Sequence, residues 1–384
     1  MKKIIAFLLV ILLLCGCGAP VPVETEPTQQ PTTQPTTQPT EVPTTVVTEP
    51  PFDPMEVVKT MTLEEKVGQM IFARCPGSGQ TAAVEEYHLG GYVLFGRDTE
   101  NQTPESLSAI IAGYQSTSKI PMLIAVDEEG GEVSRIGNRP AFRDSEFPSI
   151  RALYEQGGVE AVLEAEREKS QLLASLGINV NLAPVCDITT DPDAFMYERS
   201  LGLEPELTGQ IIAQMVEVME RENVQAVLKH FPGYGNNDDT HVDIATDIRP
   251  KEELAENDLV PFDYGFEAGA GGVMVSHVFI ADMDYEYPAS LSPVVHGFIR
   301  DTMGFEGVIM TDDMAMDGIR KKYGAELAVI LAVMAGNDMI CCSDYELTYR
   351  TILDGVNNGK FEEEMIDRAV CRIIQWKYDM GLIQ

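Results

Sequence analysis

The chain has 384 residues, of which 44% are hydrophobic, enough to form one large core or two smaller ones. Its 61 acidic and 27 basic residues give a formal net charge of -34. This balance argues against a nucleic-acid partner, which requires clustered Lys and Arg, and against electrostatic adhesion to anionic lipid. We expect a folded protein with a well-solvated acidic surface.

A basic and then apolar segment opens the chain. Lys2 and Lys3 precede an apolar run over residues 4–14, the layout of a secretory signal, and this run is short for a membrane-spanning helix. Residues 14–17 read Leu-Cys-Gly-Cys and resemble the processing box of bacterial lipoproteins. We therefore predict a signal peptide over residues 1–16 and lipidation of Cys17. The protein would be extracytoplasmic and attached to the cell membrane through lipid alone; a plain secretory signal is the alternative.

The next segment has a different composition. It is rich in Pro, Thr, Gln, Glu and Val, and it repeats Pro-Thr-Thr-Gln over residues 31–38 without any apolar period. Such a chain cannot build a core, and about 34 residues of extended, Pro-rich chain reach on the order of 100 Å. Residues 17–53 are therefore predicted to be a tether that carries a catalytic domain away from the membrane.

The cysteines of the remaining chain indicate no disulfide framework. They follow no framework spacing and form no Cys-x-x-Cys, so neither a disulfide scaffold nor a zinc site or other metal site is expected. They are Cys75, Cys186, Cys341, Cys342 and Cys371.

Short apolar runs alternate with segments of helical periodicity from residue 54 onward. The candidate strands cover residues 68–73, 91–95, 122–126, 180–184, 226–229, 272–276, 308–311 and 339–342. The clearest helical segments cover residues 159–175, 206–222, 325–335 and 362–380. Pro205 suits the first turn of the second helix because its fixed φ is already helical.

About eight repeats of strand and helix predict an α/β fold with parallel strands and crossover helices. About 330 residues of this pattern favour a single TIM-like (β/α)8 barrel domain over residues 54–384. A doubly wound sheet is the alternative. No Gly-x-Gly-x-x-Gly follows an early strand, which argues against a dinucleotide-binding fold. No cofactor is expected.

Ionisable residues follow four of the candidate strands. In a parallel barrel the C-terminal ends of the strands meet at one mouth, where active sites lie. One such Asp alone often only caps the next helix, but four such positions together predict a site. The residues concerned are Asp127, Lys229 with His230, His277, and Asp312 with Asp313.

Three segments carry a specific resemblance. Residues 229–235 read Lys-His-Phe-Pro-Gly-Tyr-Gly and are followed by Asp-Thr-His at 239–241; residues 127–135 read Asp-Glu-Glu-Gly-Gly-Glu-Val-Ser-Arg; residues 307–314 read Gly-Val-Ile-Met-Thr-Asp-Asp-Met. Together they resemble the signature of family 3 β-N-acetylglucosaminidases, in the family's order. The resemblance implies a retaining exo-glycosidase that releases terminal β-linked N-acetylglucosamine.

Cleavage of a glycosidic bond requires a carboxylate beneath the anomeric carbon and a proton donor at the leaving oxygen. Asp312, at the end of an apolar strand, suits the first role. Asp313 is a rival, although successive residues leaving a strand point to opposite sides. The resemblance assigns the nucleophile to Asp312 and the proton transfer to His241, oriented by Asp239, since His titrates near neutral pH.

By the same resemblance, a second group of residues holds the terminal sugar through its hydroxyl and acetamido groups. This group comprises Asp127, Arg135, Arg199, Lys229 and His230. Lys229 and Arg135 have an alternative role in balancing buried carboxylates.

Two other positions leave their roles open. His277 either lines the site or is a satisfied core histidine. Tyr234 replaces the second His of the family signature and cannot titrate near neutrality, so it departs from the pattern without touching the Asp239 and His241 pair.

Two further functions stay open. A family 3 β-glucosidase often takes its acid/base from a second domain, for which this chain leaves no room after its last helix. A non-catalytic wall-binding lipoprotein predicts loss of the nucleophile or of the Asp-x-His pair, and both are present. We expect a monomer that acts on glycans, either cell-wall muropeptides or N-acetylglucosamine oligosaccharides, with water or phosphate as the acceptor.

Overall fold

The computed structural model describes residues 52–237 and 245–384, and eight parallel strands form its central sheet. The strands follow the order β10-β1-β2-β3-β4-β5-β7-β9. Met310 on β9 also pairs in parallel with Met339, the residue before β10, so the sheet closes into a barrel. The barrel strands are β1 Ile71–Arg74, β2 Gly91–Leu94, β3 Leu123–Val126, β4 Val180–Asn181, β5 Gln225–Phe231, β7 Gly272–Val275, β9 Val308–Thr311 and β10 Ile340–Cys342.

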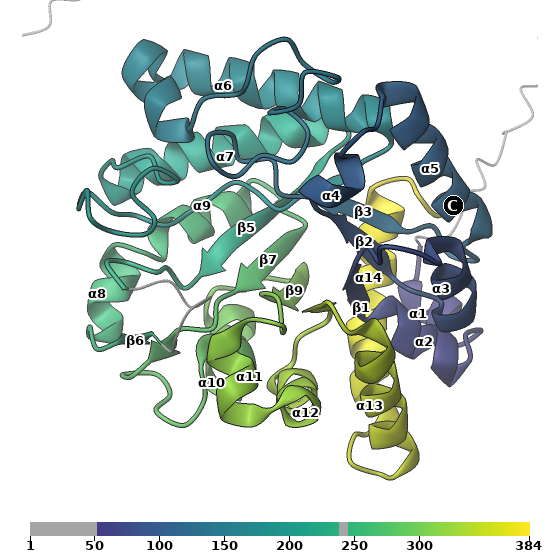
Figure 1. Cartoon of the computed structure of the whole chain (residues 1–384). Helices are drawn as coiled ribbons and strands as arrows, with labels where there is room; N and C mark the ends of the chain where they lie inside the picture. The colour runs from purple at the N-terminus through teal and green to yellow at the C-terminus, as the bar shows by residue number, and fades with distance from the viewer. Residues whose placement is uncertain (1–51, 238–244) are drawn as a thin grey trace, which may run out of the picture. The chain divides into compact units, whose positions relative to one another are not determined.

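Helices surround the strands, and at least one lies between each barrel strand and the next (Figure 1). Two short non-α helical turns, η1 Ala289–Leu291 and η2 Phe298–Thr302, join them. The α-helices are α1 Pro54–Val58, α2 Leu63–Gln69, α3 Gln80–Tyr87, α4 Gly96–Thr99, α5 Pro104–Thr117, α6 Ile150–Leu176, α7 Pro205–Arg221, α8 Lys251–Glu256, α9 Val260–Glu267, α10 Pro293–Gly297, α11 Asp317–Tyr323, α12 Ala325–Ala335, α13 Tyr345–Asn357 and α14 Glu363–Asp379. The fold is the predicted α/β TIM-like barrel.

All eight predicted strands are present, and the first and the fourth differ most from their predicted bounds. The first begins at Ile71 instead of residue 68, because α2 continues to Gln69. That helix is fixed at its start by a capping box, in which Thr62 and Glu65 each bond the other's backbone N–H. The fourth strand is shorter than residues 180–184 and ends at Asn181.

One addition to the barrel was not predicted. Strands β6 (Thr246–Asp247) and β8 (Phe279–Ile280) pair in parallel as a separate two-stranded sheet. They belong to the segments that follow β5 and β7, so this small sheet extends the C-terminal end of the barrel.

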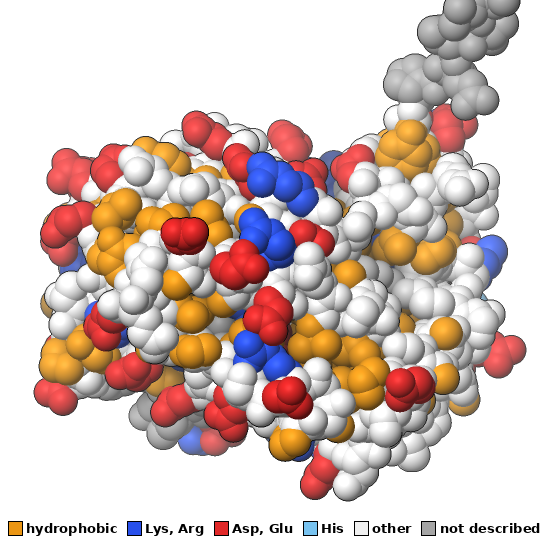
Figure 2. All heavy atoms as spheres, turned by 90° about the horizontal axis from the view of Figure 1, so that it is seen from above, with side chains coloured by type: hydrophobic (Ala, Val, Ile, Leu, Met, Phe, Trp, Pro, Cys, Tyr) orange, Lys and Arg blue, Asp and Glu red, His pale blue; other side chains and the backbone are white. Residues whose placement is uncertain are grey.

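On one face of the molecule, the charged side chains are dispersed (Figure 2). Figure 2 shows acidic side chains scattered over one face of the molecule, with the basic side chains of that face interleaved among them. Within residues 52–237 and 245–384, no helix has the length and apolar character needed to span a bilayer.

Lys377 is buried at the end of the barrel opposite the predicted site. From α14 its ammonium donates to Gln69 Oε1 at 2.6 Å and to the Gly90 carbonyl at 3.0 Å, and these two residues precede β1 and β2. Both partners are neutral, so nothing compensates the charge that burial disfavours. Burial lowers the pKa of Lys377 to about 7.

This buried lysine makes a prediction for stability against pH. Because an unfolded lysine titrates near 10.4, the unfolded state binds more protons than the native state between about pH 7 and 10. The free energy of unfolding should therefore rise with pH in that window, by up to about 1 kcal/mol per pH unit from this group. We expect Lys377→Met to remove this rise in urea titrations at pH 7, 8.5 and 10.

The matched control is Lys360→Met, which removes an exposed lysine and should leave the pH dependence of the wild type. Parallel curves for the wild type and Lys377→Met would show that the lysine stays charged in the folded protein.

Candidate active site

The strand-end residues predicted from the sequence lie at one end of the barrel. Asp127 directly follows β3, Lys229 and His230 lie within the last residues of β5, and Asp312 directly follows β9. Because the strands are parallel, these positions open at the same mouth.

Two arginines complete the described part of the predicted site, in loops after neighbouring strands. Arg135 follows β3 and Arg199 follows β4. Asp239 and His241 lie outside the described residues, so their placement stays a prediction.

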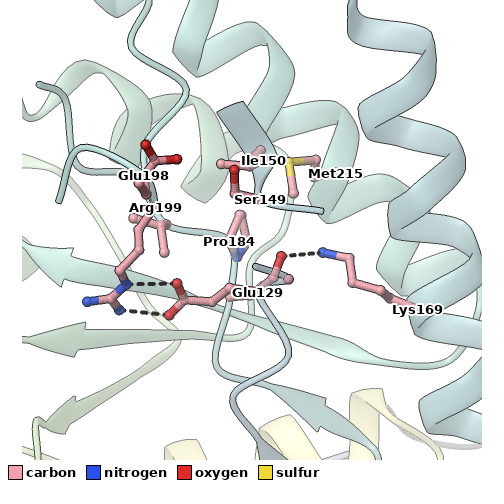
Figure 3. Close-up of a pocket in the computed structure, with 11 residues that line it drawn as sticks. Glu129, Ser149, Ile150, Lys169, Pro184, Glu198, Arg199 and Met215 are labelled. Carbon is pink, nitrogen blue, oxygen red and sulfur yellow. Dashed lines mark hydrogen bonds and ion pairs between the residues drawn. The ribbon is translucent and has the colours of Figure 1, made fainter. Parts of the chain in front are cut away.

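A chain of buried ion pairs links three strand ends. The Lys229 ammonium lies 2.7 Å from Asp127 Oδ1 and 2.6 Å from Glu129 Oε1, and Lys229 is only 1% exposed. Arg199 donates to Glu129 through two bonds, Nη2 to Oε1 at 2.8 Å and Nε to Oε2 at 2.9 Å, which Figure 3 shows as paired dashed lines. Lys169 of α6 donates to the Glu129 backbone carbonyl at 3.1 Å. The carboxylate that organises the mouth is thus Glu129.

The network determines which groups are charged. Burial alone would raise the pKa of Glu129, but the charges of Lys229 and Arg199 outweigh burial and hold that pKa well below its usual range. Burial would lower the pKa of Lys229, but Asp127 and Glu129 raise it instead. Lys229 therefore remains an ammonium and Glu129 remains a carboxylate. The ion pairs give Lys229 a place among buried carboxylates, and its contact with the sugar stays a prediction.

His230 is held by an acid that sequence reasoning missed. Asp187 Oδ2 lies 2.8 Å from His230 Nδ1 and accepts the His230 backbone N–H at 3.0 Å, while its Oδ1 accepts the Tyr234 N–H at 2.7 Å. The other ring nitrogen, Nε2, faces Arg199 Nη2 at 3.4 Å. Since a guanidinium can only donate, Nε2 is the acceptor and Nδ1 carries the proton.

Asp187 and Glu129 were both detectable from the sequence pattern. Asp187 follows the predicted strand over residues 180–184 by three positions, the same strand-end signal that identified Asp127. Glu129 lies inside the Asp-Glu-Glu-Gly-Gly segment, where only Asp127 and Arg135 were given roles.

Glu128 builds the loop that carries Arg135. It is fully buried and accepts the backbone N–H groups of Arg135 at 2.9 Å, Ile136 at 2.8 Å and Gly137 at 3.2 Å. The Arg135 side chain reaches only the Ser134 carbonyl, at 3.4 Å, and pairs with no carboxylate of the described chain. The backbone of Arg135 is thus fixed, its side chain pairs with no carboxylate of residues 52–237 or 245–384, and its contact with the sugar stays a prediction.

Asp312 and Asp313 play different parts at the end of β9. The Asp312 N–H donates to the Val275 carbonyl at 3.0 Å, and Asp312 Oδ1 accepts the Asp313 N–H at 2.8 Å. Asp313 turns away and caps the following turn through the Ala315 N–H at 2.9 Å. Burial raises the pKa of Asp313, and the neighbouring Asp312 charge adds to this rise. Asp313 therefore supports the turn after β9 and does not cap α11, whose N-cap residue is Met316.

His277 supports the backbone of this acidic pair. It is 2% exposed, with Nδ1 at 2.7 Å from Ser290 Oγ and Nε2 at 3.1 Å from the Asp313 carbonyl. A carbonyl can only accept, so Nε2 carries a proton and donates to it, while Nδ1 shares a hydrogen bond with the serine hydroxyl. His277 therefore positions the backbone beside Asp312.

The loop after β5 is anchored by a second charged cluster. Arg249 bonds Asp258 with Nη1 at 2.8 Å and bonds Asp247 with Nη2 at 2.6 Å. Gly235 (φ +54°) lies so close that a Cβ atom there would approach Arg249 Nη2 to 2.5 Å, and one at Gly233 (φ +120°) would approach Asp258 Oδ1 to 2.8 Å. Only glycine permits this close contact at positive φ.

Tyr234, the departure from the family signature, is packed inside this loop. Its ring stands edge-on to the His230 ring at 5.2 Å between centroids and is 1% exposed. It also makes an edge contact with Phe195 at 5.9 Å. The tyrosine therefore packs against the imidazole that Asp187 orients.

Within residues 52–237 and 245–384, no three His, Cys, Asp or Glu side chains converge to hold a metal ion, and the five cysteines there are free thiols. The described mouth is instead made of carboxylates, ammonium and guanidinium groups fixed on strand ends.

A parallel (β/α)8 barrel with an acidic residue at the end of β9 and charged groups at the ends of β3 to β5 defines a barrel hydrolase of the glycosidase class. The comparison with known families is specific. Residues 62–376 match the family described as Glycosyl hydrolase family 3 N terminal domain, and the chain belongs to glycoside hydrolase family 3.

Individual relatives agree with this assignment. The Beta-hexosaminidase LpqI of Mycobacterium tuberculosis is 28% identical over 337 residues, which is 85% of each chain. The Beta-hexosaminidase of Xanthomonas axonopodis pv. citri is 34% identical over 270 residues, 69% of this chain and 79% of the relative.

A solved structure, the glycoside hydrolase family 3 beta-N-acetylglucosaminidase from Paenibacillus sp. str. FPU-7, superimposes with a TM-score of 0.77 and 31% identity. The match covers 84% of this chain and 63% of that chain, so the chain spans less than two thirds of this neighbour's length. The structure of M. tuberculosis LpqI gives the same TM-score of 0.77 with 26% identity over 85% of this chain and 96% of that one.

Asp187 makes a prediction for activity. Its carboxylate accepts three N–H groups, and the amide of Asp187→Asn would turn an NH2 donor toward one of them. We expect kcat/KM on an aryl β-N-acetylglucosaminide to fall at least about tenfold, and the free energy of unfolding to fall by about 1–3 kcal/mol. The control Asp193→Asn removes an exposed acid of the same loop. Wild-type rates for both variants would mean that Asp187 does not orient His230 for the reaction.

Proposed function

We propose that this family 3 enzyme is a β-N-acetylhexosaminidase that removes terminal β-linked N-acetylglucosamine with retention, through a covalent intermediate on Asp312. The observation that carries the proposal is the position of Asp312, which shares one barrel mouth with the Asp127, Lys229 and Arg199 network. The names of the relatives support the same sugar.

In the first half of the reaction, an Asp312 oxygen attacks the anomeric carbon as the glycosidic C–O bond breaks, and the leaving oxygen takes a proton from His241. In the second half, His241 takes a proton from water, and the resulting hydroxide attacks the anomeric carbon and releases Asp312. Two inversions give net retention. Asp239 would orient the imidazole and stabilise its charged form. The Asp313 N–H bonded to Asp312 Oδ1 fixes the attacking carboxylate.

Recognition of the sugar follows from the charges of the mouth. Asp127 commits Oδ1 to Lys229, and its side chain keeps 17% of its exposure, so its second oxygen can accept sugar hydroxyl groups. Lys229, Arg135 and Arg199 supply donors, and His230 presents Nε2 on the same side as Arg199. The charge network is complete before the sugar arrives, so binding requires little reorganisation.

The substrate we favour is a cell-wall fragment rather than a plain glucoside. A tether over residues 17–53 and a lipid on Cys17 would hold the domain outside the cytoplasm, within reach of peptidoglycan. A β-glucosidase is the competing activity, and paired substrates separate the two.

A first experiment tests the sugar and the nucleophile together, with aryl β-N-acetylglucosaminide and aryl β-glucoside as substrates. The wild type should prefer the acetamido sugar, and Asp312→Ala should lose at least about 10³-fold in kcat. Azide should restore turnover of Asp312→Ala and give the α-glycosyl azide, because a small anion enters from the side of the missing carboxylate. His241→Ala should be slowed most on poor leaving groups.

The control for this series is Asp317→Ala, which removes an exposed acid on α11. A preference for the glucoside would shift the assignment to β-glucosidase. A β-glycosyl azide from Asp312→Ala would instead place Asp312 on the leaving-group side as the acid/base residue, with another residue as the nucleophile.

A second experiment tests the anchor in the full chain expressed in a bacterial cell. The wild type should partition into the detergent phase of a Triton X-114 extraction, and Cys17→Ser should move to the aqueous phase because the lipid has no attachment atom. Cys15→Ser is the matched control and should behave as the wild type. Detergent-phase recovery of Cys17→Ser would contradict the anchor at this residue.

A further inference from the structure

Arg74 is a cation at the barrel mouth that the proposed reaction does not use. It is the last residue of β1 and is half-buried. The next side chain, Cys75, points to the helix layer, where its Sγ lies 3.7 Å from the Tyr114 hydroxyl oxygen on α5. Since successive side chains of an extended chain point to opposite faces, Arg74 faces the mouth.

The arginine is held by an aromatic ring and not by a carboxylate. Its guanidinium carbon lies 4.1 Å from the ring centroid of Phe95, the residue that follows β2. Its Nε is buried without a hydrogen-bond partner. Among residues 52–237 and 245–384, Arg74 forms no ion pair, although its charge reaches the carboxyl groups of Asp98 and Asp313 at longer range. A buried donor without an acceptor is costly, and an acceptor on a bound ligand would reduce that cost.

The C-terminal ends of the strands form the rim of the barrel mouth, and the position of β1 on this rim places Arg74 near the reacting centre. In the strand order, β10, β1 and β2 lie between β9, which carries Asp312, and β3, which carries Asp127. The other side of the mouth holds the residues assigned to the terminal sugar, together with Asp187, which orients His230. Burial raises the pKa of Asp313 and the Arg74 charge opposes that rise, so the guanidinium is within electrostatic reach of the acidic pair.

The loop under Phe95 is tied to the sugar-binding loop. Arg139 donates to the Gly96 carbonyl at 2.6 Å and to Thr99 Oγ1 at 3.1 Å. Thr99 Oγ1 in turn donates to the Arg135 carbonyl at 2.7 Å. Phe95 and the Arg74 guanidinium on it are therefore fixed relative to Arg135.

We propose that Arg74, stacked on Phe95, forms the subsite for the leaving sugar and binds a carboxylate on its 3-O substituent. The inference rests on the proposed hexosaminidase activity and adds the chemistry of the released group. The strands β10, β1 and β2 adjoin Asp312, where the glycosidic bond breaks, and a guanidinium whose Nε is without an acceptor suits a carboxylate. On a chain of net charge -34, a local cation is also needed to hold an anionic substrate near the acidic pair.

The test compares substrates that differ only at this substituent. The neutral substrate is N,N′-diacetylchitobiose, and the anionic one is the same disaccharide with a 3-O-lactyl group, N-acetylglucosaminyl-N-acetylmuramic acid. A third substrate carries a dipeptide on the lactyl group, so that its carboxylate comes from the peptide. The proteins are wild type, Arg74→Met, Arg74→Lys and, as a charge-matched control on α13, Arg350→Met.

We expect the wild type to favour the lactyl disaccharide over chitobiose, with a preference that shrinks as salt rises. Arg74→Met should lose about 10- to 100-fold in kcat/KM on the anionic disaccharide and stay within about twofold of wild type on chitobiose. Arg74→Lys should recover part of the preference, and Arg350→Met all of it. If the wild type prefers the dipeptide substrate to the lactyl disaccharide, the carboxylate that Arg74 binds belongs to the peptide.

Equal losses on both disaccharides would overturn the inference, because they would mean that Arg74 acts only through the acidic pair at Asp312. So would a wild type without preference for either anionic substrate. Failure of the proposed function is distinct: the wild type would then cleave neither chitobiose nor an aryl β-N-acetylglucosaminide. Calorimetric binding of the disaccharides to Asp312→Ala, with and without Arg74→Met, measures the subsite even without turnover.

Discussion

The Lys229 ammonium is the element on which the rest of the mouth depends. It lies in nearly complete burial between Asp127 and Glu129, and through Glu129 it fixes Arg199. Taking an ammonium out of water is costly, and removing one partner of such a buried pair costs about 3–5 kcal/mol. The Lys229 ammonium therefore holds the two carboxyl groups in place, and these two groups in turn keep Lys229 protonated. A sugar entering this mouth meets donors and acceptors whose positions are already determined.

A second layer of support comes from groups whose hydrogen-bonding atoms are all paired. Asp187 uses both oxygens to hold His230 and the loop at Tyr234, and His277 uses both ring nitrogens to hold Ser290 and the Asp313 backbone. These bonds exclude alternative tautomers and rotamers of the side chains around the reacting centre. Such outer contacts are what keep a catalytic geometry within a few tenths of an ångström.

The charged site and the buried Lys377 lie at opposite ends of the barrel. The charged pairs of the mouth are compensated, whereas Lys377 at the opposite end has only neutral acceptors, from Gln69 and Gly90. Within the mouth, two groups of neighbouring strands carry different sets of residues. The strands β3 to β5 carry the groups assigned to the terminal sugar, while β1 and β2 carry Arg74 and Phe95, whose contacts leave donors unused. One fold thus provides separate recognition surfaces on neighbouring strands.

The sequence by itself determined the barrel, its eight strands and the strand-end positions of Asp127, Lys229, His230 and Asp312, because period-2 and helical patterns are local and parallel strands share one mouth. It did not determine the partners. Lys229 and Asp127 are 102 residues apart, and Asp187 and His230 are 43 apart. Only the closed barrel brings such groups within 3 Å, and local patterns contain no information on which buried charges will meet. The same holds for Arg74, which the sequence analysis did not single out and which only the tertiary structure shows stacked on Phe95.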